Sequence, residues 1–142
     1  MTALVMGLFL VPVLDHAIKL AVREWLGTGT ISLGPLGELR VVHARIWIVR
    51  ASRGVTLPAV WLLWIVAASV LAMMSTMTPS LGWCSGLLLG GSLSHALETS
   101  LRGSIFDYVC LRFWPAFNLA DVALAAGALG MVVQGYVAIH PA

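Results

Sequence analysis

The chain has 142 residues, of which 60% are hydrophobic and 10% are charged, and its mean hydropathy is +0.97. Soluble domains usually carry about a quarter charged residues, so these values exclude an ordinary water-soluble domain and indicate one membrane domain over residues 1–142. The formal net charge is +2, and the sequence has no basic cluster of the kind that binds nucleic acid. Cys84 and Cys110 match no zinc or redox spacing, so we predict that they pack as small apolar side chains.

Four runs are long and apolar enough to cross a bilayer as helices: roughly residues 2–22, 57–77, 81–97 and 117–139. Backbone polar groups in lipid must be hydrogen-bonded within their own segment, which favours helices. The first run lacks the basic start and the cleavage site of a signal peptide, so we expect it to be retained. The predicted fold class is an all-α integral membrane protein with four transmembrane helices.

The connections between these runs differ in length and character. Residues 23–56 form a long surface loop, and within it LRVVHARIWIVR, residues 39–50, is rich in β-branched and aromatic side chains. This composition predicts a small β-like region rather than an amphipathic surface helix. The other connections are residues 75–82 and residues 98–116. Gly86 and Gly90, four residues apart in the third run, predict close packing of helices.

The charged residues are predicted to gather on one side of the membrane. Four antiparallel spans bring together the end of the first, the start of the second, the end of the third and the start of the fourth. All Asp, Glu, Arg and Lys residues fall near these ends or in the connections between them, and none falls in residues 75–82 or at the termini. Ionisable groups within spans are uncommon and usually mark function. Asp15 and Lys19 share one helix face, which predicts an ion pair of structural or functional importance.

Asp107 and Asp121 form a candidate catalytic pair. A carboxylate in the first turn of a helix meets free N–H groups and the positive end of the helix dipole, so helix capping alone could place Asp121 there. Capping would not require Asn118 three residues earlier, nor Asp107 in the neighbouring connection. Two nearby carboxylates at a partly dry site do not both ionise easily, so one acts as acid and the other as base on a water. This arrangement can hydrolyse amides without a metal or other cofactor.

Several motifs resemble one known family. PAFNLAD, residues 115–121, resembles the last-span signature of signal peptidase II, the bacterial lipoprotein signal peptidase. The family's G-x-V-x-D-F, D-Q-x-x-K and glycine-rich motifs are similar to GSIFDY (103–108), DHAIK (15–19) and GGSL (90–93). The resemblance implies an intramembrane aspartyl endopeptidase that removes the signal peptide of a lipid-modified prolipoprotein before its diacylglyceryl cysteine.

The resemblance also implies roles for individual residues. Asp107 and Asp121 match the catalytic aspartates, Asn118 matches a supporting residue, and Asp15 and Lys19 match a structural or substrate-organising pair. The first connection would form a small β-cradle at the extracytoplasmic surface. We therefore expect a multi-pass monomer in the bacterial cytoplasmic membrane, with its active site near the extracytoplasmic face. Its partners would be the lipid-modified precursor and membrane phospholipid.

The chain departs from the family pattern in two places. The family's G-N-x-x-D-R reads SHALET at residues 94–99, and we predict that His95 and Glu98, three apart, form a replacement pair. The N-x-G-x-A-F motif is missing, with Ala44 at the Asn position and Ile46 at the Gly position. These changes affect substrate identity more than chemistry. Two alternatives stay open: a related protease with a different membrane substrate, and a non-catalytic lipopeptide-binding protein of the same fold. A transporter fits less well, since no repeats are visible.

The distribution of basic residues conflicts with the implied orientation. All eight Lys and Arg lie on the side that the resemblance makes extracytoplasmic, whereas the positive-inside rule alone would invert the protein. We keep the family orientation because the active face should meet exported precursors. On that side, the Arg side chains would bind anionic lipid headgroups.

Overall fold

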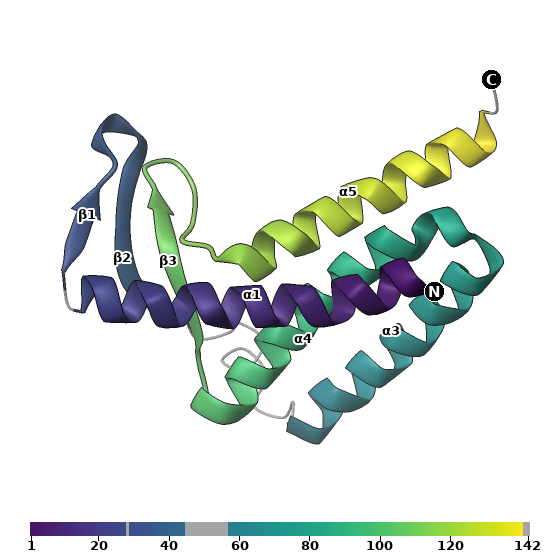
Figure 1. The fold of residues 1–142 in the computed structure, drawn as a ribbon, viewed down its shortest axis with the longest axis horizontal. Coiled ribbons are helices and arrows are strands. Elements are labelled where there is room, and N and C mark those ends of the chain that lie inside the picture. Colours follow the sequence, from purple (N-terminus) through teal and green to yellow (C-terminus); the bar gives the residue numbers. More distant parts are fainter. Residues whose placement is uncertain (28, 45–56, 141–142) are drawn as a thin grey trace.

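The computed structural model describes residues 1–27, 29–44 and 57–140. Within them the chain forms helices α1 (Thr2–Leu26), α3 (Leu57–Met77), α4 (Gly82–Arg102) and α5 (Leu119–Ile139), strands β1 (Thr30–Ser32), β2 (Gly37–Ala44) and β3 (Ile105–Leu111), and the short 3-10 turns η1 (Gly34–Leu36) and η2 (Pro79–Leu81). The strands stand where α1 ends and α5 begins, and the chain termini lie at the opposite end (Figure 1). The protein is therefore mostly helical, with a small three-stranded sheet at one end.

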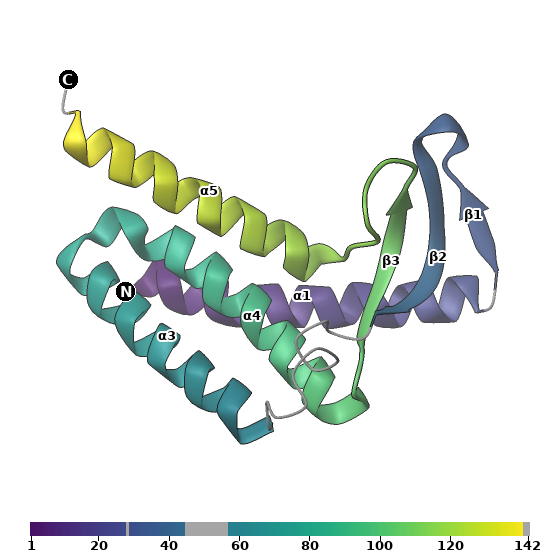
Figure 2. The ribbon, with the colours of Figure 1, turned by 180° about the vertical axis from the view of Figure 1, so that it is seen from behind.

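Helix α4 is the central element of the helical part. It packs against α1, α3 and α5, and Figure 2 shows it crossing α1 with the other two helices on either side. A Cβ atom added to Gly86 would lie 2.8 Å from the Leu4 carbonyl oxygen, and one added to Gly91 would lie 2.7 Å from that of Ala120. Small residues therefore let α1 and α5 approach the backbone of α4 closely, as the glycine spacing predicted.

Three of the described helices, α1, α3 and α5, are long and apolar enough to cross a membrane. Helix α4 differs because its neighbours cover it, so small and polar side chains replace the large apolar ones that lipid favours. In contrast, α3 and α5 leave a broad apolar surface exposed, including Leu62, Leu63, Met73, Leu129, Val132 and Tyr136. A surface of this size indicates contact with lipid or with another apolar partner.

The helix ends differ from the limits that hydropathy predicted. Helix α1 extends through the predicted loop residues Arg23 and Glu24 to Leu26, and α4 extends beyond 97 to Arg102. Hydropathy falls where a helix leaves the apolar layer, whereas the helix itself continues until the backbone is broken. The break comes at Gly27 and Gly103, whose φ angles of 53° and 68° suit glycine.

The sheet has the order β1-β2-β3 with antiparallel neighbours. Strand β2 confirms the predicted strand as far as Ala44, while residues 45–50, including Ile46, lie outside the described residues. Strand β3 was not predicted, because residues 98–116 were interpreted as a loop. Its β-branched and aromatic residues are typical of a strand, and its first four are buried. Asp107 lies in β3 opposite Val42.

The return of the chain after β3 brings the start of α5 beside this strand. Phe117 N–H donates to the Val109 carbonyl and Val109 N–H donates to the Phe117 carbonyl, both at 3.0 Å. This bridge fixes Asn118, the N-cap of α5, next to β3. The start of the helix that carries Asp121 is consequently held beside the strand that carries Asp107.

Candidate active site

Asn118 links Asp107 and Asp121 through separate hydrogen bonds. Its side-chain Nδ2 donates to Asp107 Oδ1 at 2.6 Å, and its backbone N–H donates to Asp121 Oδ2 at 2.9 Å. Asn118 is 1% exposed, so this link is shielded from solvent. The structure therefore brings together the three residues that the sequence predicted to be the catalytic pair and its support.

The spacing of Asn118 and Asp121 has a structural cause of its own. Asn118 Oδ1 accepts from the Asp121 N–H at 3.2 Å, while Asp121 accepts from the Asn118 N–H, so the two residues form a reciprocal capping box. Our prediction that capping would not require Asn118 was wrong, because this box uses both residues. Capping does not explain why the Asn118 amide also reaches across to Asp107 on β3.

The two carboxylates occupy different surroundings. Asp107 is only 6% exposed, whereas the side chain of Asp121 is 38% exposed at the start of α5. Burial raises the pKa of Asp107 from 3.8 to about 6; the Asn118 hydrogen bond opposes this rise, and the charge of Asp121 adds to it. These surroundings therefore favour the protonated form of Asp107.

His95 faces this pair from α4. Its Nε2 atom lies 3.5 Å from Asp121 Oδ1 and 3.4 Å from Asn118 Oδ1. The predicted pair between His95 and Glu98 is wrong, since Glu98 contacts Lys19 and Arg102 instead. Helix α4 lies between α5 and α1, so side chains three residues apart diverge toward different neighbours. We call Asp107, Asn118, Asp121 and His95 the aspartate site.

A second group, which we call the ion-pair cluster, consists of Asp15, Lys19, Glu98 and Arg102. Lys19 Nζ lies 2.7 Å from Asp15 Oδ2 and 2.6 Å from Glu98 Oε2, and Arg102 Nη1 lies 3.3 Å from Glu98 Oε1. The predicted ion pair between Asp15 and Lys19 is confirmed, and Asp15, Lys19 and Glu98 are almost completely buried. The cluster thus joins α1 to α4 through neutralised charges.

Asp15 connects the two groups. It accepts hydrogen bonds from Ser94 Oγ at 2.6 Å and from the Ala120 N–H at 3.2 Å, so it also holds the first turn of α5. Tyr108 was missed as a site residue, although the sequence places it directly after Asp107. Its buried hydroxyl bonds to the Leu119 backbone, and burial raises the pKa of Tyr108. The N-terminus of α5 is therefore held from both α1 and β3.

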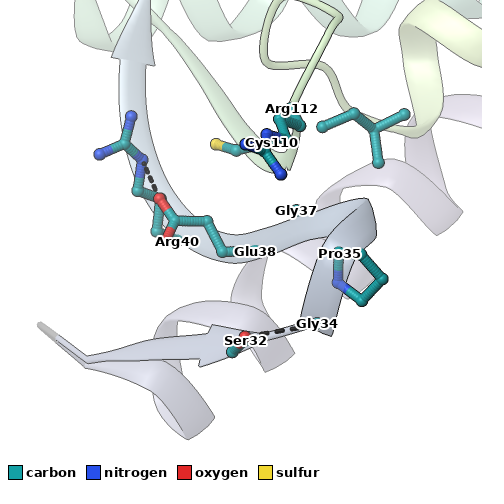
Figure 3. A pocket seen from close by; sticks show the side chains of 9 residues that line it. Ser32, Gly34, Pro35, Gly37, Glu38, Arg40, Cys110 and Arg112 are labelled. Atoms are coloured by element: carbon teal, nitrogen blue, oxygen red, sulfur yellow. Dashed lines mark hydrogen bonds and ion pairs between the residues drawn. The ribbon is translucent and has the colours of Figure 1, made fainter.

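A separate cavity of about 360 Å³ lies against the sheet (Figure 3). It contains the exposed ion pair between Arg40 Nε and Glu38 Oε1, at 3.1 Å, and the free thiol of Cys110. None of its lining residues belongs to the aspartate site. In the described ranges, no group of three or more His, Cys, Asp or Glu is arranged to hold a metal ion.

The aspartate site and its motifs agree with a comparison against protein families. A sequence model described as signal peptidase (SPase) II matches residues 7–137. The chain belongs to the signal peptidase II family. Curated relatives named lipoprotein signal peptidase include that of Xylella fastidiosa strain 9a5c, 33% identical over 85 residues, which are 50% of this chain and 51% of the relative. That of Syntrophomonas wolfei is 32% identical over 72 residues, 51% of this chain and 48% of the relative.

These alignments span about half the length of the curated relatives, or less. Solved structures extend the similarity of fold to nearly the whole chain. Two structures described as a bacterial membrane enzyme superpose with TM-scores of 0.76 and 0.77 at 15% identity. They cover 94% and 98% of this chain, and 91% and 90% of the solved chains. The fold seen here is thus that of a known bacterial membrane enzyme.

Proposed function

We propose that this signal peptidase II family member is an aspartyl endopeptidase that cuts within the membrane. It would remove the signal peptide of a lipid-modified prolipoprotein before the diacylglyceryl cysteine. The observation that carries the proposal is the bridge of Asn118 to both Asp107 and Asp121. Family membership and the names of the curated relatives support the substrate class.

In the proposed reaction one aspartate of the pair is protonated and the other is ionised. The ionised carboxylate removes a proton from a water, whose oxygen attacks the peptide carbonyl carbon. The protonated carboxyl donates to the carbonyl oxygen, which stabilises the tetrahedral intermediate. Two further donors lie nearby, and both are already engaged: Lys19 by Asp15 and Glu98, and the Asn118 amide by Asp107 Oδ1 and the Phe106 carbonyl, so the scheme assigns this hydrogen bond to the protonated carboxyl. No cofactor takes part in this scheme.

The proposed setting is the bacterial cytoplasmic membrane, with residues 1–142 forming one membrane domain. We propose that α4 crosses the bilayer beside the three apolar helices, because its polar and small side chains face protein rather than lipid. The aspartate site would lie near the extracytoplasmic face, where exported precursors arrive with their lipid tails in the bilayer. One chain supplies both aspartates, Asn118 and His95, which supports a monomer as the working unit.

The test is a gel-shift cleavage assay with purified protein in detergent. The substrate is a diacylglyceryl-modified lipoprotein precursor, and the same precursor without lipid is the substrate control. We expect wild type and Glu38→Gln, a change at an exposed carboxylate of β2, to cut the lipidated form before its cysteine, and Asp121→Asn to leave it intact. Cleavage by Asp121→Asn at the wild-type rate would eliminate the dyad mechanism.

A second candidate is a related protease for a different membrane substrate. His95, which stands where the family motif has Asn, contacts Asp121 directly and therefore changes the surroundings of the reacting group. For this candidate we expect no cleavage of the lipidated precursor, but Asp121-dependent cleavage of other membrane-inserted signal peptides. A lipopeptide-binding protein would instead bind the lipidated precursor equally well as wild type and as Asp121→Asn, and cut neither.

A further inference from the structure

The two aspartates differ in the donors around them. Asp121 Oδ2 accepts from the Asn118 N–H at 2.9 Å, and Oδ1 lies 3.5 Å from His95 Nε2, which also lies 3.4 Å from Asn118 Oδ1. Asp107 receives the Asn118 amide at Oδ1. A negative charge on a carboxylate is stabilised by each N–H directed at it, so these contacts favour ionisation of Asp121.

The position of Asp121 in the fold acts in the same direction. It is the third residue of α5, where the helix dipole places partial positive charge, and its side chain is 38% exposed. Asp107 lies on a strand without such a dipole and is 6% exposed. When one proton is shared between the two carboxyls, it therefore resides on Asp107.

We propose that His95 is a positioning residue that keeps Asp121 ionised as the base of the dyad, which leaves Asp107 as the acid. This inference rests on the proposed protease function and assigns the roles within it. In the tautomer with its proton on Nε2, His95 has two acceptors within reach, Asn118 Oδ1 and Asp121 Oδ1, and in the proposed role it turns to Asp121 when substrate is bound, without needing a charge of its own. Catalytic hydrogen bonds are often long in the empty site and shorten when substrate excludes water, so 3.5 Å is a starting distance.

The proton balance then runs through both aspartates. Asp121 takes one proton from the water as the water oxygen bonds to the carbonyl carbon, and Asp107 gives its proton to the carbonyl oxygen. When the carbon–nitrogen bond breaks, the proton on Asp121 passes to the leaving amine. Asp107 recovers a proton from the hydroxyl that becomes the new carboxyl group. The dyad ends as it began, with Asp107 protonated and Asp121 ionised.

Other titratable groups surround Asp121, and they do not replace His95. Strand β3 contributes Asp107 and Tyr108, which interact with Asp121 electrostatically but carry no positive charge. On the α1 side, Asp15 binds the neighbouring Ala120 N–H, and Lys19 is held between Asp15 and Glu98. Among the described residues, His95 is accordingly the basic side chain that contacts the Asp121 carboxylate.

The experiment measures kcat and KM for the lipidated precursor between about pH 4 and 8 in wild type, His95→Leu and His95→Gln. A carboxylate that loses an N–H donor beside it is protonated more easily. For His95→Leu we therefore expect the ascending limb of kcat/KM to move up by about one pH unit. On the acid side this is about a tenfold loss of kcat, with KM changed less than about twofold.

Two variants serve as controls. In His95→Gln an amide keeps a donor near Asp121, so we expect recovery of most of the wild-type profile. His140→Gln makes the same change at an exposed histidine stacked on Tyr136 at the far end of α5, and should leave the profile unchanged. A His95→Leu profile that matches wild type, or a loss confined to KM, would overturn the proposal.

A titration of 13C-labelled aspartate carboxyls by NMR tests the inference without turnover. We expect Asp121 to ionise at lower pH than Asp107, and His95→Leu to raise the ionisation pH of Asp121 only. If wild type cleaves the precursor but this order is absent, the assignment of His95 fails and the protease function stands. If the order is present but no lipidated precursor is cut, the effect of His95 on Asp121 stands and the proposed function fails.

Discussion

The ion-pair cluster and the aspartate site lie side by side around the start of α5, and each contains two carboxylates. In the cluster, Asp15 and Glu98 face two cations, Lys19 and Arg102, at 2.6 to 3.3 Å. In the aspartate site, Asn118 bonds to both Asp107 and Asp121, His95 lies beside Asp121, and neither carboxylate forms an ion pair with a Lys or Arg within residues 1–27, 29–44 and 57–140. The two acids of the ion-pair cluster are therefore neutralised by neighbouring cations, whereas the two acids of the aspartate site are not.

This difference separates structural from chemical use of buried acids. A neutralised, hydrogen-bonded cluster holds helices together but leaves no proton free to move. A carboxylate that is buried without a cation keeps its proton easily and can exchange it near neutral pH. We therefore expect changes in the cluster to act mainly on stability, and changes in the aspartate site mainly on activity.

The largest expected effect follows from Asp107→Asn. The amide cannot donate an acid proton, so cleavage should fall about 1,000-fold or more. The melting temperature in detergent should change by only about 1–2 °C, because the variant also removes a carboxylate that burial penalises when ionised. The matched control is Glu38→Gln on the exposed face of the sheet, expected to keep full activity. If Asp107→Asn melts at a much lower temperature but keeps the specific activity of wild type, Asp107 acts on stability and not on activity, which contradicts our comparison.

Lys19→Met should have the next largest effect, and it should act on stability. The variant leaves Asp15 and Glu98 buried without their common cation, a loss of about 3–5 kcal/mol in the free energy of unfolding. Thermal unfolding in detergent, followed by tryptophan fluorescence, measures this. The double variant Lys19→Met with Glu98→Gln should recover part of the loss, since it removes one of the two stranded charges. An unchanged melting temperature for Lys19→Met would show that the cluster is not structural.

The sequence predicted the positions of the helices, and the residues of the aspartate site and the ion-pair cluster, better than it predicted the contacts between these residues. Apolar runs located all four helices, because burial or lipid contact leaves a direct trace in composition. Helix ends were predicted less well, since Gly27 and Gly103 end the helices by backbone conformation rather than by hydropathy. Strand β3 was missed because its seven residues lie in a connection with charged residues on both sides, and that composition predicted a loop.

Contacts between elements could not be predicted from spacing alone. Asp15 and Lys19 are local on one helix, so their pairing was predicted correctly. His95 and Glu98 are equally local, yet they diverge because α4 lies between α5 and α1, a fact of packing rather than of spacing. The capping box at Asn118 was available in the sequence as an N-cap residue followed three positions later by an acid.

A smaller effect concerns pH. Because the pKa of Asp107 rises from 3.8 to about 6, the folded state binds more protons than the unfolded state within that window. The Asp107 contribution to stability therefore decreases as pH increases from about 4 to 6, and then levels off. The difference in melting temperature between wild type and Asp107→Asn should fall across the same range. A constant difference would mean that Asp107 is not protonated more readily when folded.

The pH dependence of kcat/KM tests the same group by its activity. Its descending limb should lie near pH 6 if Asp107 is the acid.

The smallest expected effect comes from Arg102→Gln, at the rim of the ion-pair cluster. Arg102 is 39% exposed and lies 3.3 Å from Glu98 Oε1, so solvent screens the pair and Lys19 still neutralises the same carboxylate. We expect a loss of about 1 kcal/mol, or about 2–4 °C in melting temperature. Arg40→Gln, in an ion pair with 55% and 40% exposed partners, should cost less still. If Arg102→Gln destabilises the protein as much as Lys19→Met, Glu98 depends on both cations equally, and the division between a buried core and a screened rim of the cluster does not hold.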